Sequence, residues 1–508
     1  MSQQACHGES LRGAAAPPCG SEEDAFARLI APAGVKEFFE ESWQRAPRVF
    51  RAADVSVGGE GGGSAPSCSR EASCRPIAPQ TWADCLDMLT RAWGAAPVPP
   101  PDGCDLLVFK GRQMTHAYEW SGPCAALLDG ASCVVNHAEF VWPPLARLCM
   151  EMRSKLLHVY CNSYVTPPAA QAVPPHADDR DVFILQMLGC KHWRVFGNPP
   201  IKLPYTDEQV GKNGFPIPDR VFAVPPVIEC VLQPGDVLYM PRGFVHEACC
   251  PGQTSSWHAT LAVATHDWSW SKVFASTIAE AMDAESSAHW RAAVPLGLGT
   301  SVGSQDEAEA DSVVEAELER LMDLVRQTVS VPALRKRLVA KLESHNWNQV
   351  EASSSFQREL SRCPPQEEGP APLHWRTRFV REDARVRIAS EESTEADSLS
   401  AGKGKCKGKG KGKGGIIVRE ELREAALFTM EELQRRRDEG LVVAEFAKAV
   451  PDGVDRMPFD KLAQLCLARV GVAAGLLQVV EAEEESGFCS DSARVGREKY
   501  RARVTACC

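Results

Sequence analysis

The chain has 508 residues, of which 44% are hydrophobic, and a formal net charge of −11. This length suits two to four domains with ordinary buried cores, and the negative charge argues against broad affinity for nucleic acid, which needs a basic surface. The sequence contains no run of about 18 apolar residues, and its first twenty residues lack the apolar core of a secretory signal. We therefore expect neither a membrane span nor export.

The 20 cysteines stand singly or as adjacent pairs, and no Cys-x-x-Cys motif occurs. Such spacing argues against a disulfide framework and against a zinc ribbon. We interpret them as reduced thiols of an intracellular protein.

The N-terminal part is expected to be irregular with helical pieces. Residues 1–21 are predicted to be disordered, and residues 22–104 to form a helical segment leading into an edge strand. A low-complexity insertion rich in Gly and Ser occupies 52–75. The pattern at 82–93 predicts an amphipathic helix, which the proline cluster at 97–101 ends. We place a domain boundary there.

Residues 105–268 consist mainly of short apolar or alternating runs separated by Gly, Pro and Asn. Many short strands with turn signals between them predict an antiparallel barrel or double-sheet jelly roll rather than a βαβ sheet. A single helical stretch at 143–157 interrupts the pattern.

Two histidines and a carboxylate in this region form a candidate iron site. His176 and Asp178 stand two apart before an apolar strand, and His246 follows a later strand. Because side chains alternate along a strand, His176 and Asp178 share one side of the backbone, whereas Asp179 faces the other. Two imidazoles and one carboxylate with open positions are typical of non-haem Fe(II) oxygenases. Zinc is the alternative, although it usually has a closed tetrahedral site.

A bare His-x-Asp is weak evidence, because chance matches are expected and the chain also contains His137-Ala138-Glu139. The neighbouring strand strengthens the interpretation. Alternation places Lys191 on the same face as Trp193 and Val195, where a lysine is unusual unless it meets an anion. We therefore expect a carboxylate ligand beside Lys191.

Three extended motifs carry a family resemblance: PPHADDRDVFILQMLGCKHWRVF, LQPGDVLYMPRGFVHEA and SSWHATLAV. They resemble the iron-binding core of the JmjC ribosomal oxygenases, described as bifunctional lysine-specific demethylases and histidyl-hydroxylases. FFEESWQRAPRVF, VVNHAEFVWPPLARLC and HVYCNSYVTPP extend the resemblance over most of residues 36–270. It implies an α+β fold with a double-stranded β-helix (jelly-roll, cupin) JmjC core, then a helical dimerisation module and a C-terminal winged-helix-like domain.

The resemblance also assigns roles to residues. It makes His176, Asp178 and His246 the Fe(II) ligands and catalytic residues, with 2-oxoglutarate and O₂ as co-substrates. Lys191 is the implied partner of the distal carboxylate of 2-oxoglutarate.

Further co-substrate contacts are implied for Asn162, Tyr164 and Thr260. Taken alone, Asn162 and Tyr164 would be read as ordinary strand residues. His258 lies on the same strand as Thr260, where it can line the same pocket. The chain departs from the family at Ala262, where members often carry a small hydroxyl residue. Loss of that hydroxyl would weaken one hydrogen bond by about 1 kcal/mol.

The implied function is oxidation of a protein side chain. The expected substrate is a histidine of a ribosomal protein, with demethylation of histone lysine attributed to some family members. The alternative is a catalytically weak or inactive JmjC scaffold that binds at the ribosome or chromatin.

Residues 269–365 show apolar residues at helical spacing, including a short helix expected at 332–342. These helices either cap the barrel or, as in the resembling family, form a dimerisation module. We expect a homodimer.

Residues 372–485 are expected to form a winged-helix-like domain, with the Lys/Gly-rich insertion 389–415 inside its first hairpin and a tail at 486–508. The six lysines of 402–415 suit either a solubilising loop or an RNA-contacting element that directs the protein to the nucleus or nucleolus, with the cytoplasm as the alternative. Residues 416–485 carry 9 Lys and Arg against 15 Asp and Glu, which argues against direct DNA binding and favours protein contact.

Overall fold

The computed structural model describes residues 24–57, 77–78, 80–94, 98–212, 214–284, 288–294, 307–363, 385–388, 399–401, 416–436, 441–446, 460–474 and 476–480. The predictions for the N-terminal 21 residues, most of the 52–75 insertion, the lysine run and the C-terminal tail lie outside this part of the chain. The chain divides into two compact units: the first comprises 1–81, 98–115 and 132–363, and the second comprises 82–97, 116–131 and 364–508. None of the helices in the described residues is both long and apolar enough to cross a membrane.

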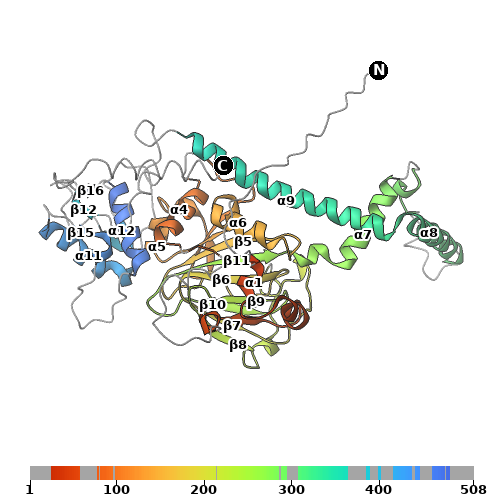
Figure 1. Ribbon diagram of the computed structural model, residues 1–508, viewed down its shortest axis with the longest axis horizontal. Coiled ribbons are helices and arrows are strands. Elements are labelled where there is room, and N and C mark those ends of the chain that lie inside the picture. Colours follow the sequence, from red (N-terminus) through yellow and green to blue (C-terminus); the bar gives the residue numbers. More distant parts are fainter. Residues whose placement is uncertain are drawn as a thin grey trace, which may run out of the picture. The chain divides into compact units, whose positions relative to one another are not determined.

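The first unit is built on two antiparallel sheets (Figure 1). The larger sheet has the spatial order β1 (Arg48–Phe50), β9 (Val237–Met240), β6 (Asp181–Gly189), β11 (Ser256–Val263), β5 (Tyr160–Thr166), β4 (Ser132–Val135), β2 (Leu106–Lys110) and β3 (Gln113–Thr115). The smaller sheet has the order β10 (His246–Cys249), β7 (Lys191–Val195) and β8 (Ile228–Leu232). The prediction of a double-sheet antiparallel fold is therefore confirmed.

The inner faces of the two sheets meet in an apolar core. Val182 and Ile184 of the larger sheet belong to one buried cluster with Trp193, Val195 and Leu232 of the smaller sheet. Side chains from facing strands pack in this way when two sheets stack face to face. The core holds the sheets together and leaves the ends of β6 and β10 free to position functional groups.

The N-terminal segment covers the outer face of the larger sheet. Its elements are α1 (Ala25–Ile30), α2 (Val35–Glu37) and a π-helical turn (Phe38–Ser42), which lead into edge strand β1. The expected single helical pattern is broken, because Pro32 and Gly34 interrupt it. Phe26 and Phe38 pack against Phe183, which points outward from β6, and this explains why β6 is apolar on both faces.

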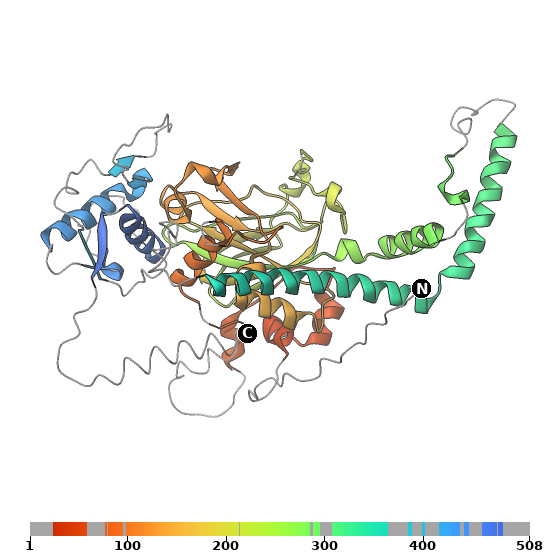
Figure 2. The same cartoon turned by 90° about the horizontal axis from the view of Figure 1, so that it is seen from above.

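Four longer helices complete the first unit: α6 (Pro143–Met152), α7 (Trp270–Ala284), α8 (Glu307–Thr328) and α9 (Val331–Arg362). The short helix expected at 332–342 is wrong in length, because α9 spans 32 residues in all. Figure 2 shows it as one continuous helix. Its C-terminal half has a polar sequence but buries Gln349 and Phe356. Short turns lie at η2 (Ala52–Val57), η4 (Ala138–Phe140), η5 (Thr206–Glu208), η6 (Asp219–Val221), η7 (Thr265–Trp268) and η8 (His289–Arg291).

The second unit combines helices from the N-terminal half with the C-terminal segment. Its elements are α4 (Trp82–Ala92), η3 (Ala117–Glu119), α5 (Pro123–Leu128), β12 (Arg385–Ile388), β13 (Leu399–Ala401), β14 (Ile416–Val418), α11 (Glu420–Arg435), β15 (Leu441–Val442), η13 (Val443–Glu445), α12 (Lys461–Ala473) and β16 (Leu477–Val480). Asp87 of α4 pairs with buried Arg469 of α12 at 3.0 Å. β12 pairs antiparallel with β15 and β16. The expected hairpin around the lysine run is wrong, since β13 and β14 pair in parallel.

Candidate metal centre and adjoining cavity

The first unit brings His176, Asp178 and His246 together at one end of the sheets. The backbones of His176 and His246 form an isolated antiparallel bridge, with N···O distances of 3.1 and 2.9 Å. Asp178 lies beside them, so that one possible ligand atom from each residue falls within 4.8 Å of the others. The three residues predicted from the sequence therefore form one cluster of side chains that could hold a metal ion.

Both imidazoles are oriented to offer the same ring nitrogen. The Nδ1 atom of His176 lies 2.7 Å from the carbonyl oxygen of Pro174, and that of His246 lies 3.1 Å from the carbonyl oxygen of Phe244. A carbonyl accepts only from an N–H, so Nδ1 carries the proton and Nε2 keeps its lone pair. The two Nε2 atoms lie 3.6 and 3.8 Å from the oxygens of Asp178.

The protonation states also suit a divalent cation. Burial, reinforced by the charge of Lys212, lowers the pKa of His176 to about 3. Burial also lowers the pKa of His246. Burial acts to raise the pKa of Asp178, but Lys212 and the two imidazoles together hold it below its ordinary value. Two neutral imidazoles and one carboxylate are thus present at neutral pH.

The loop between β7 and β8 supports the His-Ala-Asp segment. Ala177 N donates to the carbonyl of Val210 at 2.9 Å, and Lys212 Nζ donates to Asp178 Oδ1 at 2.6 Å. Gly211 lies against the backbone of His176. Sequence reasoning missed Lys212, because it lies in an irregular loop whose path follows no periodic pattern.

Asp179 faces away from the three-residue cluster, as alternation predicts. It is fully buried, and its oxygens accept from Arg180 Nε at 2.5 Å and from Thr206 Oγ1 at 2.7 Å. The second His-x-acid motif, His137-Ala138-Glu139, does not join the three-residue cluster. Glu139 is fully buried, pairs with His137 at 3.0 Å and accepts a hydrogen bond from Cys161 N at 2.9 Å. Both carboxylates serve internal hydrogen bonding.

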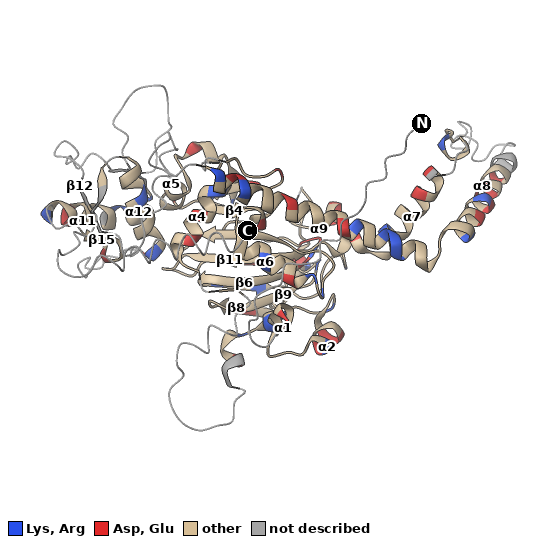
Figure 3. Cartoon of the chain, turned by 45° about the horizontal axis from the view of Figure 1, so that its top comes forward, with Lys and Arg blue, Asp and Glu red and all other residues tan. Residues whose placement is uncertain are grey.

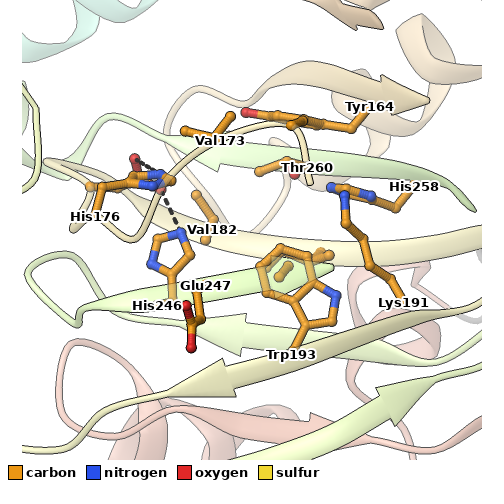
Figure 4. A pocket seen from close by; sticks show the side chains of 14 residues that line it. Tyr164, Val173, His176, Val182, Lys191, Trp193, His246, Glu247, His258 and Thr260 are labelled. Atoms are coloured by element: carbon orange, nitrogen blue, oxygen red, sulfur yellow. Dashed lines mark ion pairs between the residues drawn. The ribbon is translucent and has the colours of Figure 1, made fainter. Parts of the chain in front are cut away.

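A cavity adjoins the three-residue cluster and encloses about 480 Å³ of atom-free space, its mouth included. Figure 4 shows His176 and His246 at one side of the cavity and Lys191 at the other. Val182, Ile184 and Trp193 provide apolar walls between these two polar ends.

Lys191 is 3% exposed, and burial lowers the pKa of its ammonium. Its Nζ atom donates to Thr166 Oγ1 at 3.1 Å, and no ion pair joins it to a carboxylate of the described residues. The predicted position on the inner face of β7 is therefore seen in the structure, and it leaves this cation available to an anionic ligand.

The other expected contacts divide into two groups. Tyr164 and Thr260 line the cavity with Lys191. Asn162 is not among the lining residues, and its Oδ1 atom accepts from His137 N at 3.2 Å. Ala262 packs in the apolar core between the sheets.

Two stacked antiparallel sheets with an inward-facing His-Asp-His cluster define a cupin-like fold with a candidate metal centre. Residues 135–271 match the JmjC domain family. Residues 135–271 therefore form a JmjC domain, and the chain is similar to the ribosomal oxygenases that its motifs resemble.

Several curated proteins are similar to this chain. Ribosomal oxygenase 1 of Gallus gallus is 28% identical over 314 residues, which cover 60% of this chain and 47% of that protein. Ribosomal oxygenase 1 of Homo sapiens is 32% identical over 166 residues, which cover 32% of this chain and 25% of that protein. The bifunctional lysine-specific demethylase and histidyl-hydroxylase NO66 of Drosophila persimilis is 29% identical over 244 residues, which cover 46% and 31%. The chain thus matches less than half the length of each.

Among solved structures, the ribosomal oxygenase YcfD from Escherichia coli in complex with cobalt and 2-oxoglutarate matches with a TM-score of 0.34 and 15% identity. The match covers 89% of this chain and 99% of that chain.

Proposed function

We propose that the protein is an Fe(II)- and 2-oxoglutarate-dependent oxygenase that hydroxylates a histidine side chain of a ribosomal protein. The observation that carries the proposal is the pairing of two features in one cavity. One end presents His176, Asp178 and His246 with both Nε2 atoms free, and the other presents the unpaired ammonium of Lys191. A metal-chelating 2-oxo acid with a distal carboxylate fits such a cavity.

The donor set fits Fe(II), because two imidazoles and one carboxylate leave part of an octahedron open. Iron together with O₂ and 2-oxoglutarate supplies the oxidising power for attack on an unactivated C–H bond. The protein contributes the geometry: the carbonyls of Pro174 and Phe244 orient the imidazoles, and Lys191 would bind the distal carboxylate. The apolar walls of the cavity would exclude water from the bound co-substrate.

The substrate class follows the printed names of the relatives, which include ribosomal oxygenases and a bifunctional lysine-specific demethylase and histidyl-hydroxylase. Hydroxylation and N-demethylation both begin with oxidation of a C–H bond, so the same site could serve either. We therefore propose histidine hydroxylation first and demethylation of histone lysine second.

Mass spectrometry of peptide products tests these activities directly. Purified protein with Fe(II), ascorbate and 2-oxoglutarate is incubated with a library of ribosomal histidine peptides and histone methyl-lysine peptides. Hydroxylation adds one oxygen atom to a peptide, whereas demethylation removes one methylene unit. We expect wild type to add oxygen to a histidine peptide and the His176→Ala variant to add none. Turnover that persists in His176→Ala would refute the proposed activity. Absence of turnover by wild type would favour a binding scaffold.

The proposed assembly is a homodimer formed through α7, α8 and α9. Leu318, Met322 and Trp347 on these helices are exposed, and such apolar side chains suit contact with a second copy. Acidic and basic residues are interspersed along α8 and α9 (Figure 3), which would favour one defined register.

The C-terminal unit is proposed to contain a winged-helix-like domain that contacts protein rather than DNA. Its described part has helices α11 and α12 and the β15-β12-β16 sheet, and the acidic balance of residues 416–485 supports this choice. RNA contact through the Lys/Gly-rich segment and a location in the nucleus or nucleolus complete the proposal.

A further inference from the structure

Two buried thiols meet inside the second unit. Cys124 lies on α5 and Cys466 lies on α12, and these two helices pack against each other (Figure 1). Cys124 is 8% exposed and Cys466 is 1% exposed, and neither forms a disulfide in this structure. The thiol of Cys466 donates a hydrogen bond to the sulfur of Cys124. The two sulfur atoms are therefore in direct contact.

A buried guanidinium adjoins this thiol pair. Arg469 follows Cys466 by one helical turn on α12, is 2% exposed and pairs with Asp87 of α4 at 3.0 Å. The hydrogen bond from Cys466, reinforced by the charge of Arg469, lowers the pKa of Cys124 against the opposing effect of burial. Burial raises the pKa of Cys466 well above its ordinary value. Cys124 is therefore the thiol that ionises first, and Cys466 keeps its proton.

Three buried thiols of the first unit show the opposite behaviour. Burial raises the pKa of Cys104 to about 12 and raises those of Cys149 and Cys161 well above their ordinary values. Such thiols react slowly, because the thiolate is the nucleophile. Cys124 instead combines a lowered pKa with a second thiol in contact, and a reversible disulfide needs both features.

We propose that Cys124 and Cys466 are a redox-responsive pair, which a peroxide converts into a reversible disulfide between α5 and α12. The two cysteines stand 342 positions apart in the chain, so the bond would tie a segment of the N-terminal half to the C-terminal segment. The contacts that now join these segments are non-covalent. Intracellular disulfides are usually transient and often redox-sensing. This inference concerns the second unit and does not depend on the proposed oxygenase activity.

The reaction balances with hydrogen peroxide as the oxidant. The Cys124 thiolate attacks one peroxide oxygen, the O–O bond breaks, and the leaving hydroxide takes up the proton that Cys124 lost; Cys124 is then a sulfenic acid. The sulfur of Cys466 attacks the sulfur of Cys124, and its proton leaves with the hydroxyl group as water. Two thiols thus become one disulfide while peroxide becomes two waters. Because the thiols already touch, a small movement of the six-residue helix α5 brings the sulfurs to about 2 Å.

Mass spectrometry of the oxidised full chain tests the pairing. The reduced protein is kept metal-free with a chelator, so that iron-driven oxidation does not compete, and is treated with increasing hydrogen peroxide. Remaining thiols are blocked with N-ethylmaleimide in denaturant before digestion without reductant. A non-reducing gel is run in parallel, because a disulfide that closes so long a loop makes the denatured chain more compact. Cys124→Ser and Cys466→Ala remove the pair, and Cys104→Ser is the matched control at another buried thiol.

We expect wild type and Cys104→Ser to give peptides joined through Cys124 and Cys466 and a faster gel band, both reversed by dithiothreitol. Cys124→Ser and Cys466→Ala should give neither product. In wild type, Cys104 should be oxidised about tenfold less than the pair at the same dose. Links from Cys124 or Cys466 to other cysteines would overturn the inference, as would a pair that stays reduced while the partly exposed Cys363 is oxidised. The wild-type peptide map alone decides this, whether or not each variant folds.

Discussion

Lys191 is a buried charge that is expected to lower the stability of the ligand-free protein. Its ammonium is buried with a single side-chain hydrogen bond, and burying an unpaired charge has a free-energy cost. The walls around it are apolar or aromatic, among them Ile184 and Trp193. The cost is expected to disappear when a carboxylate occupies the cavity.

Lys191→Met is therefore predicted to stabilise the ligand-free protein by about 1 kcal/mol or more, because an apolar side chain of similar length replaces the buried charge. The same variant should lose the rise in Tm that 2-oxoglutarate gives to metal-loaded wild type. Thermal unfolding with and without 2-oxoglutarate measures both effects. Lys202→Met, at an exposed position of the following loop, should change neither; a destabilised Lys191→Met protein would contradict this account.

Two glycines of the β7–β8 loop give a matched pair of substitutions. Gly211 and Gly214 have φ angles of +79° and +78°, so alanine strains the backbone to a similar extent at both. A Cβ at Gly211 would lie 2.4 Å from the carbonyl oxygen of Pro175 and 2.8 Å from Cα of His176, whereas a Cβ at Gly214 meets nothing within 4 Å.

Gly211→Ala is predicted to weaken Mn²⁺ binding about tenfold or more, because the displaced His176 no longer aligns with the other ligands. Gly214→Ala should bind Mn²⁺ like wild type. Calorimetric titration of both variants gives the comparison, and equal affinities would show that the loop does not position the metal ligands.

His176 and Asp178 could be predicted because they stand two apart in the segment that leads into β6. Two-residue alternation separates Asp178 from Asp179, and the run from β6 through Gly189 into β7 places Lys191 on the inner face. Lys212 could not be predicted, because it reaches Asp178 from an irregular loop. The hydrogen bond of Asn162 to the backbone of His137 also depends on tertiary packing that no local pattern encodes.

At the scale of elements, α9 depends on buried polar contacts in its C-terminal half. Gln349 donates to Glu139 at 2.7 Å and to the carbonyl of Val159 at 2.9 Å. His158 donates from Nδ1 to Asn346 Oδ1 at 2.8 Å. These contacts explain the extension of the helix beyond its amphipathic start, which sequence periodicity alone could not show. The strands β3 and β10 give no clear sequence signal, because three or four residues carry too little alternation.

The contact of His158 with α9 leads to a pH prediction. Burial lowers the pKa of His158 in the folded state, whereas in the unfolded chain the imidazole titrates near about 6.5. The unfolded state therefore binds more protons below that pH, and stability is lost as the pH falls from about 6.5 toward the folded pKa. His158→Gln, which does not titrate, should lose less Tm than wild type between about pH 7.5 and about pH 5.5. The same acid-induced loss in both proteins would contradict the assignment.

At the scale of the whole molecule, the exposed apolar stripe of α8 predicts self-association. Leu318 and Met322 stand one helical turn apart and are 54% and 49% exposed. If a second copy covers these two side chains, glutamate at both positions would place two charges in the interface. The double variant should therefore be a monomer where wild type is a dimer. Light scattering coupled to size exclusion measures the mass. Gln327→Glu, a substitution at an exposed position of the same helix, is the control and should leave the mass unchanged. A double variant that stays dimeric would show that this face of α8 does not form the dimer interface.

The two-sheet core was predictable at this scale, because its strands are apolar and its turns carry Gly and Pro. The set of segments that forms the second unit could not be predicted, because α4 and α5 contact α12, which lies far from them in the sequence. Asp87 and Arg469 pair across 382 residues, as their positions in the chain show. No local signal at either residue indicates the other.

The central claim is that one cavity holds a metal at His176, Asp178 and His246 and a 2-oxo acid between that metal and Lys191. Anaerobic calorimetric titration of 2-oxoglutarate into the full chain, with and without Fe(II), tests it most directly. The account predicts one site per chain that requires Fe(II), and affinity reduced about a hundredfold or more in Asp178→Ala. Binding of equal strength without metal, undiminished binding by Asp178→Ala, or no binding to iron-loaded wild type would contradict it.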